Sequence, residues 1–318
     1  MSNQTLRRSI AGVIVSSCLF AASLGVSAQS GADQAIPSVR EFVSQDSMNV
    51  YRRFVPEHRD KMLQYYGQVL ELRALQPINF GGGAQMILFG VGSGQVKLAT
   101  GLKQGRDYDV GSLTGGTGIR LLTLFFTDEQ ALTSRFAAHG YAKPEFKAGR
   151  HGARVALVAD PGGFLTELVI VPEGEGATDR MEVGVAVSDL ARSRAFYREF
   201  VGLDELPAVE DEILGVTRYP YRHGQTTINL WEVGPGLPAD TGSAGVQYVV
   251  SNVDTVNDRA TARHVAVETP LGNMAGFSLR TVWLNDPDGV TNYFAQVGAG
   301  GGGRGGRGGR GAGGSAPQ

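Results

Sequence analysis

The chain of 318 residues is poor in the side chains that most often carry metal and redox chemistry. It has one cysteine, Cys18, and five histidines. Because Cys18 lies in an apolar N-terminal stretch, the rest of the chain has no thiol, which excludes disulfides, thiolate nucleophiles and cysteine-ligated metals there. The histidines show no H-x-x-x-H spacing, and no G-x-S-x-G or H-E-x-x-H motif occurs. Any chemistry must therefore come from carboxylates, amides, phenols and cations.

Residues 1–28 have the composition of an export signal. Arg7 and Arg8 give a positive start, an apolar stretch rich in serine and glycine follows, and small residues precede Gln29. The apolar stretch is short, so we expect a cleaved signal rather than a retained membrane helix. We therefore expect a periplasmic or secreted protein without a membrane span after cleavage, with residues 29–47 as an N-terminal extension.

Residues 299–318 form a tail rich in glycine and arginine, with no apolar side chain large enough to be buried. We expect a disordered tail, although arginine-glycine-glycine repeats also occur in nucleic-acid-binding segments. Without the signal and the tail, the body carries 24 basic and 31 acidic residues, a net charge of −7. An acidic body with three tail arginines does not favour a nucleic-acid partner.

An Asp-Pro-x-Gly turn occurs twice, at 160–163 and 286–289, and an alternating run follows each time. The aspartate can accept backbone N–H groups, the proline fixes its own φ, and the glycine permits a left-handed conformation. We therefore expect Gly163 and Gly289 to have positive φ, and each turn to lead into a final strand. Turns of this kind are common, so the long-range repeat is the informative feature.

The repeated turn belongs to a larger pattern of strand, helix and three strands. Hydrophobic periodicity and turn residues predict this pattern four times, with opening strands and helices within 49–75, 118–141, 182–201 and 246–264. The chain therefore has the organisation of an α+β protein with four βαβββ modules. Two modules in each half give predicted domains at 48–173 and 180–298.

The family resemblance rests on "VGVAVSDLARSRAFYREFVGLDEL" at 183–206, its weaker echo "YYGQVLELRAL" at 65–75, and the hairpins "DPDGVTNYF" and "DPGGFLTEL". Together they resemble the vicinal oxygen chelate superfamily of glyoxalases, bleomycin- and fosfomycin-resistance proteins, epimerases and extradiol dioxygenases. The resemblance covers Met48 to Val297. It implies two glyoxalase-like domains whose paired modules curl mixed β-sheets into a ligand-holding cup. Function does not follow from it, because one fold hosts many chemistries.

The resemblance also implies where a metal would bind. Metal-dependent members take histidine and glutamate ligands from the first and last strands of paired modules, and the ion acts as a Lewis acid. If each half pairs its own modules, the first cup contains Tyr51, Lys97, Arg120 or Leu121, and Glu167. The second cup then contains Glu182, Asn229, Gly245 or a neighbour, and Tyr293. Neither set is a good transition-metal site, because both lack imidazole and Lys97 repels a cation.

A second arrangement, in which modules are exchanged between halves, stays open. Pairing the second module with the third would bring Glu167, Glu182 and Asn229 together, and these oxygens could weakly hold Mg²⁺, Mn²⁺ or Ca²⁺. A plainer alternative is that the two glutamates form ion pairs on the sheet. For Glu167 we consider three cationic partners: Arg120 first, then Lys97, and last a metal.

The remaining candidates are ligand-binding side chains and one possible base. Tyr51, Tyr293 and Trp231 could supply aromatic walls, while Lys97 and Arg120 could meet an anionic group. His223 lies at a predicted hairpin near the cup rim and is a candidate for a general base. Glu167 is the other catalytic candidate.

Three functions compete on this evidence. The first is metal-independent binding of a small organic ligand, as in the resistance proteins of the superfamily, with no cofactor. The second is a divalent-metal lyase, isomerase or dioxygenase that uses the exchanged carboxylates. The third is a non-catalytic envelope protein that packs against a partner. Whether the protein is an enzyme stays open.

Overall fold

The computed structural model describes residues 36–102, 111–174, 178–240 and 243–298, which belong to one compact unit of the chain. The predicted signal at 1–28 and the tail at 299–318 lie outside these ranges. None of the helices within the described ranges is long and apolar enough to span a membrane.

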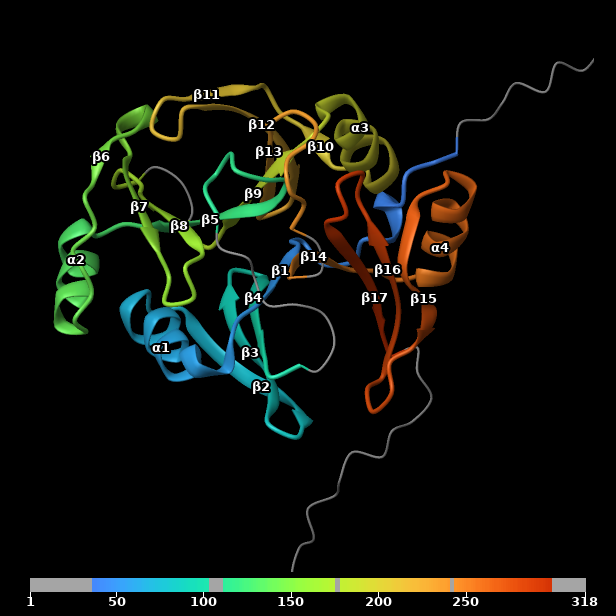
Figure 1. Ribbon diagram of the computed structural model, residues 1–318, viewed down its shortest axis with the longest axis horizontal. Coiled ribbons are helices and arrows are strands. Elements are labelled where there is room, and N and C mark those ends of the chain that lie inside the picture. Colours follow the sequence, from blue (N-terminus) through green and yellow to red (C-terminus); the bar gives the residue numbers. More distant parts are fainter. Residues whose placement is uncertain (1–35, 103–110, 175–177, 241–242, 299–318) are drawn as a thin grey trace, which may run out of the picture. The chain divides into compact units, whose positions relative to one another are not determined.

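The four predicted modules are present, and each supplies strands to one of two sheets (Figure 1). The first module has β1 Asn49–Arg53, α1 Arg59–Gln64 with its wider continuation η3 Tyr65–Val69, β2 Arg73–Gly81, β3 Ala84–Val91 and β4 Gly94–Thr100. The second has β5 Gly118–Phe126, α2 Glu129–Ala138, β6 Lys147–Ala148, β7 Arg154–Ala159 and β8 Leu165–Ile170.

The second half repeats the order with one addition. The third module has β9 Met181–Val187, α3 Leu190–Arg194 continued by η5 Ala195–Val201, β10 Asp204–Glu205, β11 Val209–Asp211, β12 Val216–His223 and β13 Thr226–Glu232. The fourth has β14 Ala244–Val249, α4 Val253–Ala262, β15 Ala266–Asn273, β16 Leu279–Asn285 and β17 Thr291–Val297. Short helical turns lie at Arg40–Phe42, Pro56–His58 and Arg150–Gly152.

The sheets decide which modules pair, a question that the sequence left open. The eight-stranded sheet has the order β15-β16-β17-β14-β1-β4-β3-β2 (Figure 1). The nine-stranded sheet has the order β10-β12-β13-β9-β5-β8-β7-β6, and its ninth strand, β11, pairs with β12. The antiparallel pair β1–β14 therefore joins the first module to the fourth, and β5–β9 joins the second to the third. Pairing within each half, which defined two of the predicted residue sets, is wrong, and the exchanged arrangement is present. The domain boundaries at 48–173 and 180–298 stay a prediction.

Contacts between helix and turn connect the modules of one half. The Tyr66 hydroxyl, in the first module, donates to the Asp160 carboxylate of the second at 2.8 Å. Tyr197 donates in the same way to Asp286 at 2.9 Å. Gly163 and Gly289, which end these two turns, have φ of 81° and 85°, so the predicted left-handed conformations are confirmed. In each half, the repeated turn and a tyrosine of the first helix therefore form the same contact.

Side-chain caps explain where three of the helices begin. The side chains of Asp128, Asp189 and Asn252 accept from the backbone N–H three residues later, which satisfies a donor that the first helical turn leaves free. The first helix ends earlier than we predicted, at Val69 rather than Leu75, and β2 already begins at Arg73.

Each sheet has one face against the helices and one face turned away from them. Strand residues alternate between faces, and Leu122 and Leu168 join Phe136 of α2 in the main hydrophobic cluster. We call the opposite face, which carries Thr123 and Glu167 in the nine-stranded sheet, the inner face. In the eight-stranded sheet, Val96 and Leu98 belong to the same cluster, so Lys97 lies on the inner face.

Candidate functional site

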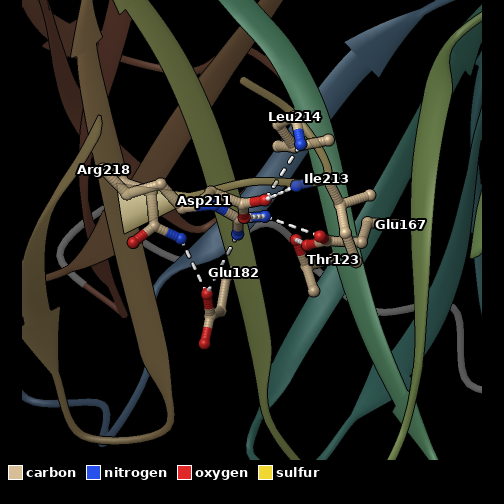
Figure 2. A network of polar contacts seen from close by, with 8 residues as sticks. Thr123, Glu167, Glu182, Asp211, Ile213, Leu214 and Arg218 are labelled. Carbon is tan, nitrogen blue, oxygen red and sulfur yellow. Dashed lines mark hydrogen bonds and ion pairs between the residues drawn. The ribbon is translucent and has the colours of Figure 1, made fainter. Parts of the chain in front are cut away.

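The inner face of the nine-stranded sheet is organised around a buried arginine, Arg218, which is 7% exposed. Its guanidinium forms an ion pair of 2.5 Å with Glu167 of β8, and a second with Asp211 of β11. Glu182 of β9 lies 3.9 Å from another nitrogen of the same group. Figure 2 shows the guanidinium among these carboxylates. We call this cluster, together with Thr123 and Asn229, the arginine site.

Neutral side chains complete the hydrogen bonding of two of the carboxylates. The Thr123 hydroxyl donates to Glu167 at 2.7 Å (Figure 2). The Asn229 amide donates to Glu182 at 2.7 Å. Burial raises the pKa of Glu182, and the bond from Asn229 and the charge of Arg218 oppose that rise. For Arg218, the carboxylates outweigh burial and raise the pKa, so the guanidinium stays charged.

A loop closes this site. The carboxylate of Asp211 accepts the backbone N–H groups of Ile213 and Leu214 at 3.1 and 2.9 Å (Figure 2). These two side chains then pack against separate small apolar clusters of the same sheet. The first cluster has Phe125, Val155, Val169 and Val171, and the second has Leu121, Ala186 and Trp231. The arginine site is therefore held between apolar side chains on a filled face.

The inner face of the eight-stranded sheet carries a lysine instead. The Lys97 amine donates to the carbonyl oxygen of Gln247, which also accepts from the Asn49 amide at 2.9 Å. Tyr293 lies directly opposite Gln247 in the neighbouring strand. We call Asn49, Lys97, Gln247 and Tyr293 the lysine site.

Burial changes the acidity of two groups in the lysine site. It lowers the pKa of Lys97 to about 8, because a cation loses hydration there. It raises the pKa of Tyr293 to about 12, although a hydrogen bond with the Gln247 side chain partly opposes the rise. The amine is therefore partly uncharged near neutral pH, whereas the phenol keeps its proton.

The surroundings of the lysine site are only partly buried. Lys97, Tyr293, Tyr51, Met86 and Trp283 all retain some exposure, and none of them belongs to a buried hydrophobic cluster. The Trp283 ring meets the Tyr293 ring edge-on, with centroids 5.2 Å apart.

Two buried polar atoms on the same face, Trp283 Nε1 and Asn285 Oδ1, have no hydrogen-bond partner among the described residues. Unpartnered buried atoms are uncommon in folded proteins, and they can be satisfied by a ligand. Two surface hollows, one beside Phe196 and one beside Tyr141, contain none of the residues that define the two sites, although Asn285 lines the first of them.

The two sites occupy equivalent places in their sheets. Gln247 faces Tyr293 in the parallel pair β14–β17, as Thr123 faces Glu167 in β5–β8. The strand register gives the full correspondence: Asn49 with Glu182, Lys97 with Asn229, Gln247 with Thr123, and Tyr293 with Glu167. The same register places Met86 where the other sheet has Arg218.

Several of the predicted site residues have other roles. Arg120 was ranked first as the partner of Glu167, and that is wrong: Arg218 pairs with Glu167, while Arg120 donates to the backbone oxygen of Thr117 at 2.9 Å. The opening-strand position opposite Glu167 is Thr123, not Arg120 or Leu121. The other expected partner, Lys97, lies in the eight-stranded sheet.

The structure also places the remaining candidates. Trp231 is 1% exposed and donates to the backbone oxygen of Leu113 at 3.0 Å, so it belongs to the filled face. Its ring lies so close to Gly184 that an added Cβ would come within 2.5 Å of it. His223 is held by the backbone oxygen of Gln45 at 2.8 Å, so its Nε2 must donate. Tyr51 lies opposite Lys97 in the strand register.

Neither site fits a divalent metal. In the arginine site the guanidinium already occupies the point where Glu167, Glu182 and Asp211 converge, and an arginine does not lose its proton. In the lysine site the possible donors are amides, a phenol and an amine, none of them a strong anionic ligand. Among the described residues, no group of three or more His, Cys, Asp or Glu side chains is arranged to hold a metal ion.

Comparisons with known proteins agree with this architecture. A family model described as Glyoxalase/Bleomycin resistance protein/Dioxygenase superfamily matches residues 181–294. Glyoxalase I from Zea mays is 19% identical, with a TM-score of 0.63 over 80% of this chain and 92% of that chain. A putative dioxygenase from Bacillus subtilis is 17% identical, with a TM-score of 0.52 over 80% and 86%. These identities show the fold alone. The search of curated proteins finds no match.

Proposed function

The chain carries a domain of the glyoxalase/bleomycin resistance/dioxygenase superfamily, and from this premise we propose that it is an exported, metal-independent binding protein for a small organic molecule. The ligand binds on the inner face of the eight-stranded sheet, beside the lysine site. Residues 1–28 direct the export of the protein to the periplasm or the medium.

The observation that carries this proposal is the cation present in each site. In metal-dependent members of the superfamily, the ion lies where the inner strands of two modules meet, and here Arg218 and Lys97 lie at those points. A metal ion at either point would be repelled by the cation that the protein already places there. The chain therefore keeps positive charge at the centre of both faces without a metal.

The two faces differ in how much room they leave for a ligand. On the arginine face, Ile213, Leu214 and Trp231 cover the site with apolar groups. On the lysine face, Tyr51, Tyr293 and Trp283 are partly exposed, as expected of aromatic walls around a small ligand. Lys97 and Trp283 Nε1, which has no partner in the part of the chain that the structure describes, add two donors for an oxygen atom of the ligand.

The competing enzyme would use Mg²⁺, Mn²⁺ or Ca²⁺ at Glu167, Glu182 and Asn229. Such an ion would have to displace Arg218 from two carboxylates, which leaves a buried guanidinium without a counter-charge. The physical cost of that step favours the metal-independent function.

A thermal-shift screen of small organic compounds, run with and without a chelator, tests this proposal. A compound that binds only the native state raises the melting temperature by mass action. We expect hits whose effect survives the chelator and is lost or weakened at least fivefold in Trp283→Ala or Lys97→Met.

Glu182→Gln is the matched control, because Glu182 lies at the equivalent place on the other face and its side chain is 21% exposed. It should leave the hits unchanged. Hits that vanish with the chelator and in Glu182→Gln, but persist in Lys97→Met, would overturn the proposal in favour of the metal-dependent enzyme.

A further inference from the structure

Lys97 is the only lysine among the described residues that is partly buried. Lys61, Lys143 and Lys147 are all exposed, whereas Lys97 lies on a central strand between β1 and β3. Its amine contacts an amide oxygen of Gln247, which accepts a hydrogen bond but does not neutralise the charge. In this contact the amine is therefore held by a neutral acceptor and not by a carboxylate.

This inference deepens the proposed function and rests on it: the ligand lies on the lysine face. We propose that Lys97 is a covalent binding site for small aldehydes and ketones, and that its Nζ forms an imine with the carbonyl carbon of the ligand. The nitrogen lone pair attacks that carbon and gives a carbinolamine. The carbonyl oxygen then leaves as water with the two amine hydrogens, so the step needs no oxidant, reductant or cofactor.

An uncharged amine is the first requirement of this step. Burial lowers the pKa of Lys97 to about 8, so roughly a tenth of the amine is neutral at pH 7. An ordinary exposed lysine has on the order of 300-fold less neutral amine at that pH. Lys97 is also partly exposed, so a small molecule can reach it.

A proton donor for the departing oxygen is the second requirement. Tyr293 shares Gln247 with Lys97, through a side-chain hydrogen bond of its own, and its pKa of about 12 keeps the hydroxyl protonated at neutral pH. The Trp283 ring packs against Tyr293, and its Nε1, which has no partner among the described residues, is a second donor on this face. The lysine face therefore offers a nucleophile and two neighbouring donors.

The elements that surround Lys97 carry neutral side chains, two arginines and one carboxylate on this face. Arg53, two residues beyond Tyr51 on β1, donates to the backbone oxygen of Leu102 at 2.9 Å, and the guanidinium of Arg73 lies over Gly90 of β3. Tyr51 of β1, Leu88 of β3 and Gln247 of β14 face it or contact it. The carboxylate of Glu268, on β15, is bonded to the Thr291 hydroxyl at 2.6 Å, two residues before Tyr293 on β17. The shift of the Lys97 pKa has burial as its cause, which is consistent with a weak influence of Glu268.

Reductive trapping on the full chain tests the proposal. The wild-type protein is incubated with benzaldehyde and sodium cyanoborohydride at pH 7, and modified lysines are mapped by peptide mass spectrometry. We expect Lys97 to be alkylated at least tenfold faster than the exposed Lys61, Lys143 and Lys147, which serve as internal controls. Alkylation of Lys97 no faster than that of these lysines would overturn the proposal, and this comparison requires no variant.

Two further measurements separate a reactive site from a merely accessible one. The ratio of the rate at Lys97 to the rates at the exposed lysines should fall as the pH rises from about 8 to 10, because only the exposed amines still gain neutral form in that range, and the pH dependence of the hydride reduction cancels in this ratio. Tyr293→Phe should lower the rate at Lys97 at least threefold while leaving the exposed lysines unchanged. A Lys97 profile that follows the exposed lysines, or an unchanged rate in Tyr293→Phe, would contradict the assigned roles.

Benzyl alcohol, which lacks the carbonyl group, distinguishes this inference from the proposed function. If it stabilises the wild type and not Trp283→Ala, while benzaldehyde is not trapped at Lys97, the imine is refuted and the binding face stands. If neither compound acts at this face, the inference and its premise both fail for this ligand class.

Discussion

The inner faces of the two sheets place a cation at comparable points, but they surround it with different groups. Arg218 has Glu167 and Asp211 as ion-pair partners and apolar clusters on both sides. Lys97 has an amide oxygen as its hydrogen-bond acceptor, and partly exposed aromatic side chains stand around it. One face resembles a protein core with an internal ion pair, and the other resembles a binding surface.

This difference shows how one backbone can host two roles. A buried arginine matched by carboxylates is inert, because its charge and its hydrogen-bonding groups are satisfied within the protein. An amine without a matched charge keeps its capacity for a ligand, and burial makes it a weaker base. We infer that the arginine site stabilises the fold while the lysine site carries function.

The largest expected effect comes from removing Arg218. Arg218→Met leaves Glu167 and Asp211 without their cation in a covered site, and breaking a buried pair from one side costs about 3–5 kcal/mol. We expect a loss of that size in the free energy of unfolding, measured by urea denaturation. Lys97→Met, the matched change on the other face, should cost less than 1 kcal/mol. Equal losses in both variants would erase the distinction between the faces.

Glu167→Gln should have a smaller but clear effect. The glutamine keeps the shape and can still accept from Thr123, but it loses the charge that faces Arg218, so we expect a loss of about 1–3 kcal/mol. Glu182→Gln is the control, because Glu182 lies farther from the guanidinium and is more exposed. If Glu182→Gln proves the more damaging of the two by urea denaturation, we have assigned the main ion pair wrongly.

The smallest effect is a pH dependence on the lysine face. Lys97 titrates near 8 in the folded protein and near 10.5 when unfolded, so the unfolded chain binds more protons between these values. The free energy of unfolding should therefore rise with pH from about 8 to about 10.5, by on the order of 1–2 kcal/mol after allowance for partial exposure.

The difference between the wild type and Lys97→Met isolates this term from other titrations in the same range. Lys143→Met, at an exposed position, is the control and should follow the wild type. Parallel stability curves for the wild type and Lys97→Met across this pH range would contradict a depressed Lys97.

Much of the fold could be predicted from local signals. The Asp-Pro-x-Gly turns, the capped helix starts and the alternating strands follow from short-range chemistry, and they define four modules. Module pairing did not follow, because β14 and β5 both offer an apolar strand as a partner for β1. Side chains in three dimensions, not the pattern along the chain, select between such partners.

The lysine site was better predicted than the arginine site. Lys97 and Tyr293 lie on closing strands, where the superfamily resemblance directs attention. Arg218 lies one strand earlier, in "GVTRYPY", and we gave that strand no role. The sequence did point to Arg218, because it shares one face of a strand with Val216 and Pro220. A charge on an otherwise apolar face needs a partner. Thr123 lies five residues before Asp128, which caps α2, and Gln247 lies five residues before Asn252, which caps α4. Counting back from each cap would therefore have found both residues.

The central claim is that protein cations stand where a metal would bind, and metal content tests it most directly. The wild type and Glu167→Gln would be purified without chelator, dialysed against Mn²⁺ and then against metal-free buffer, and analysed by inductively coupled plasma mass spectrometry. We expect less than about 0.1 equivalent of any divalent metal in both proteins, since Arg218 already occupies the carboxylates. One equivalent in the wild type that is lost in Glu167→Gln would contradict the account and support a metal-dependent enzyme.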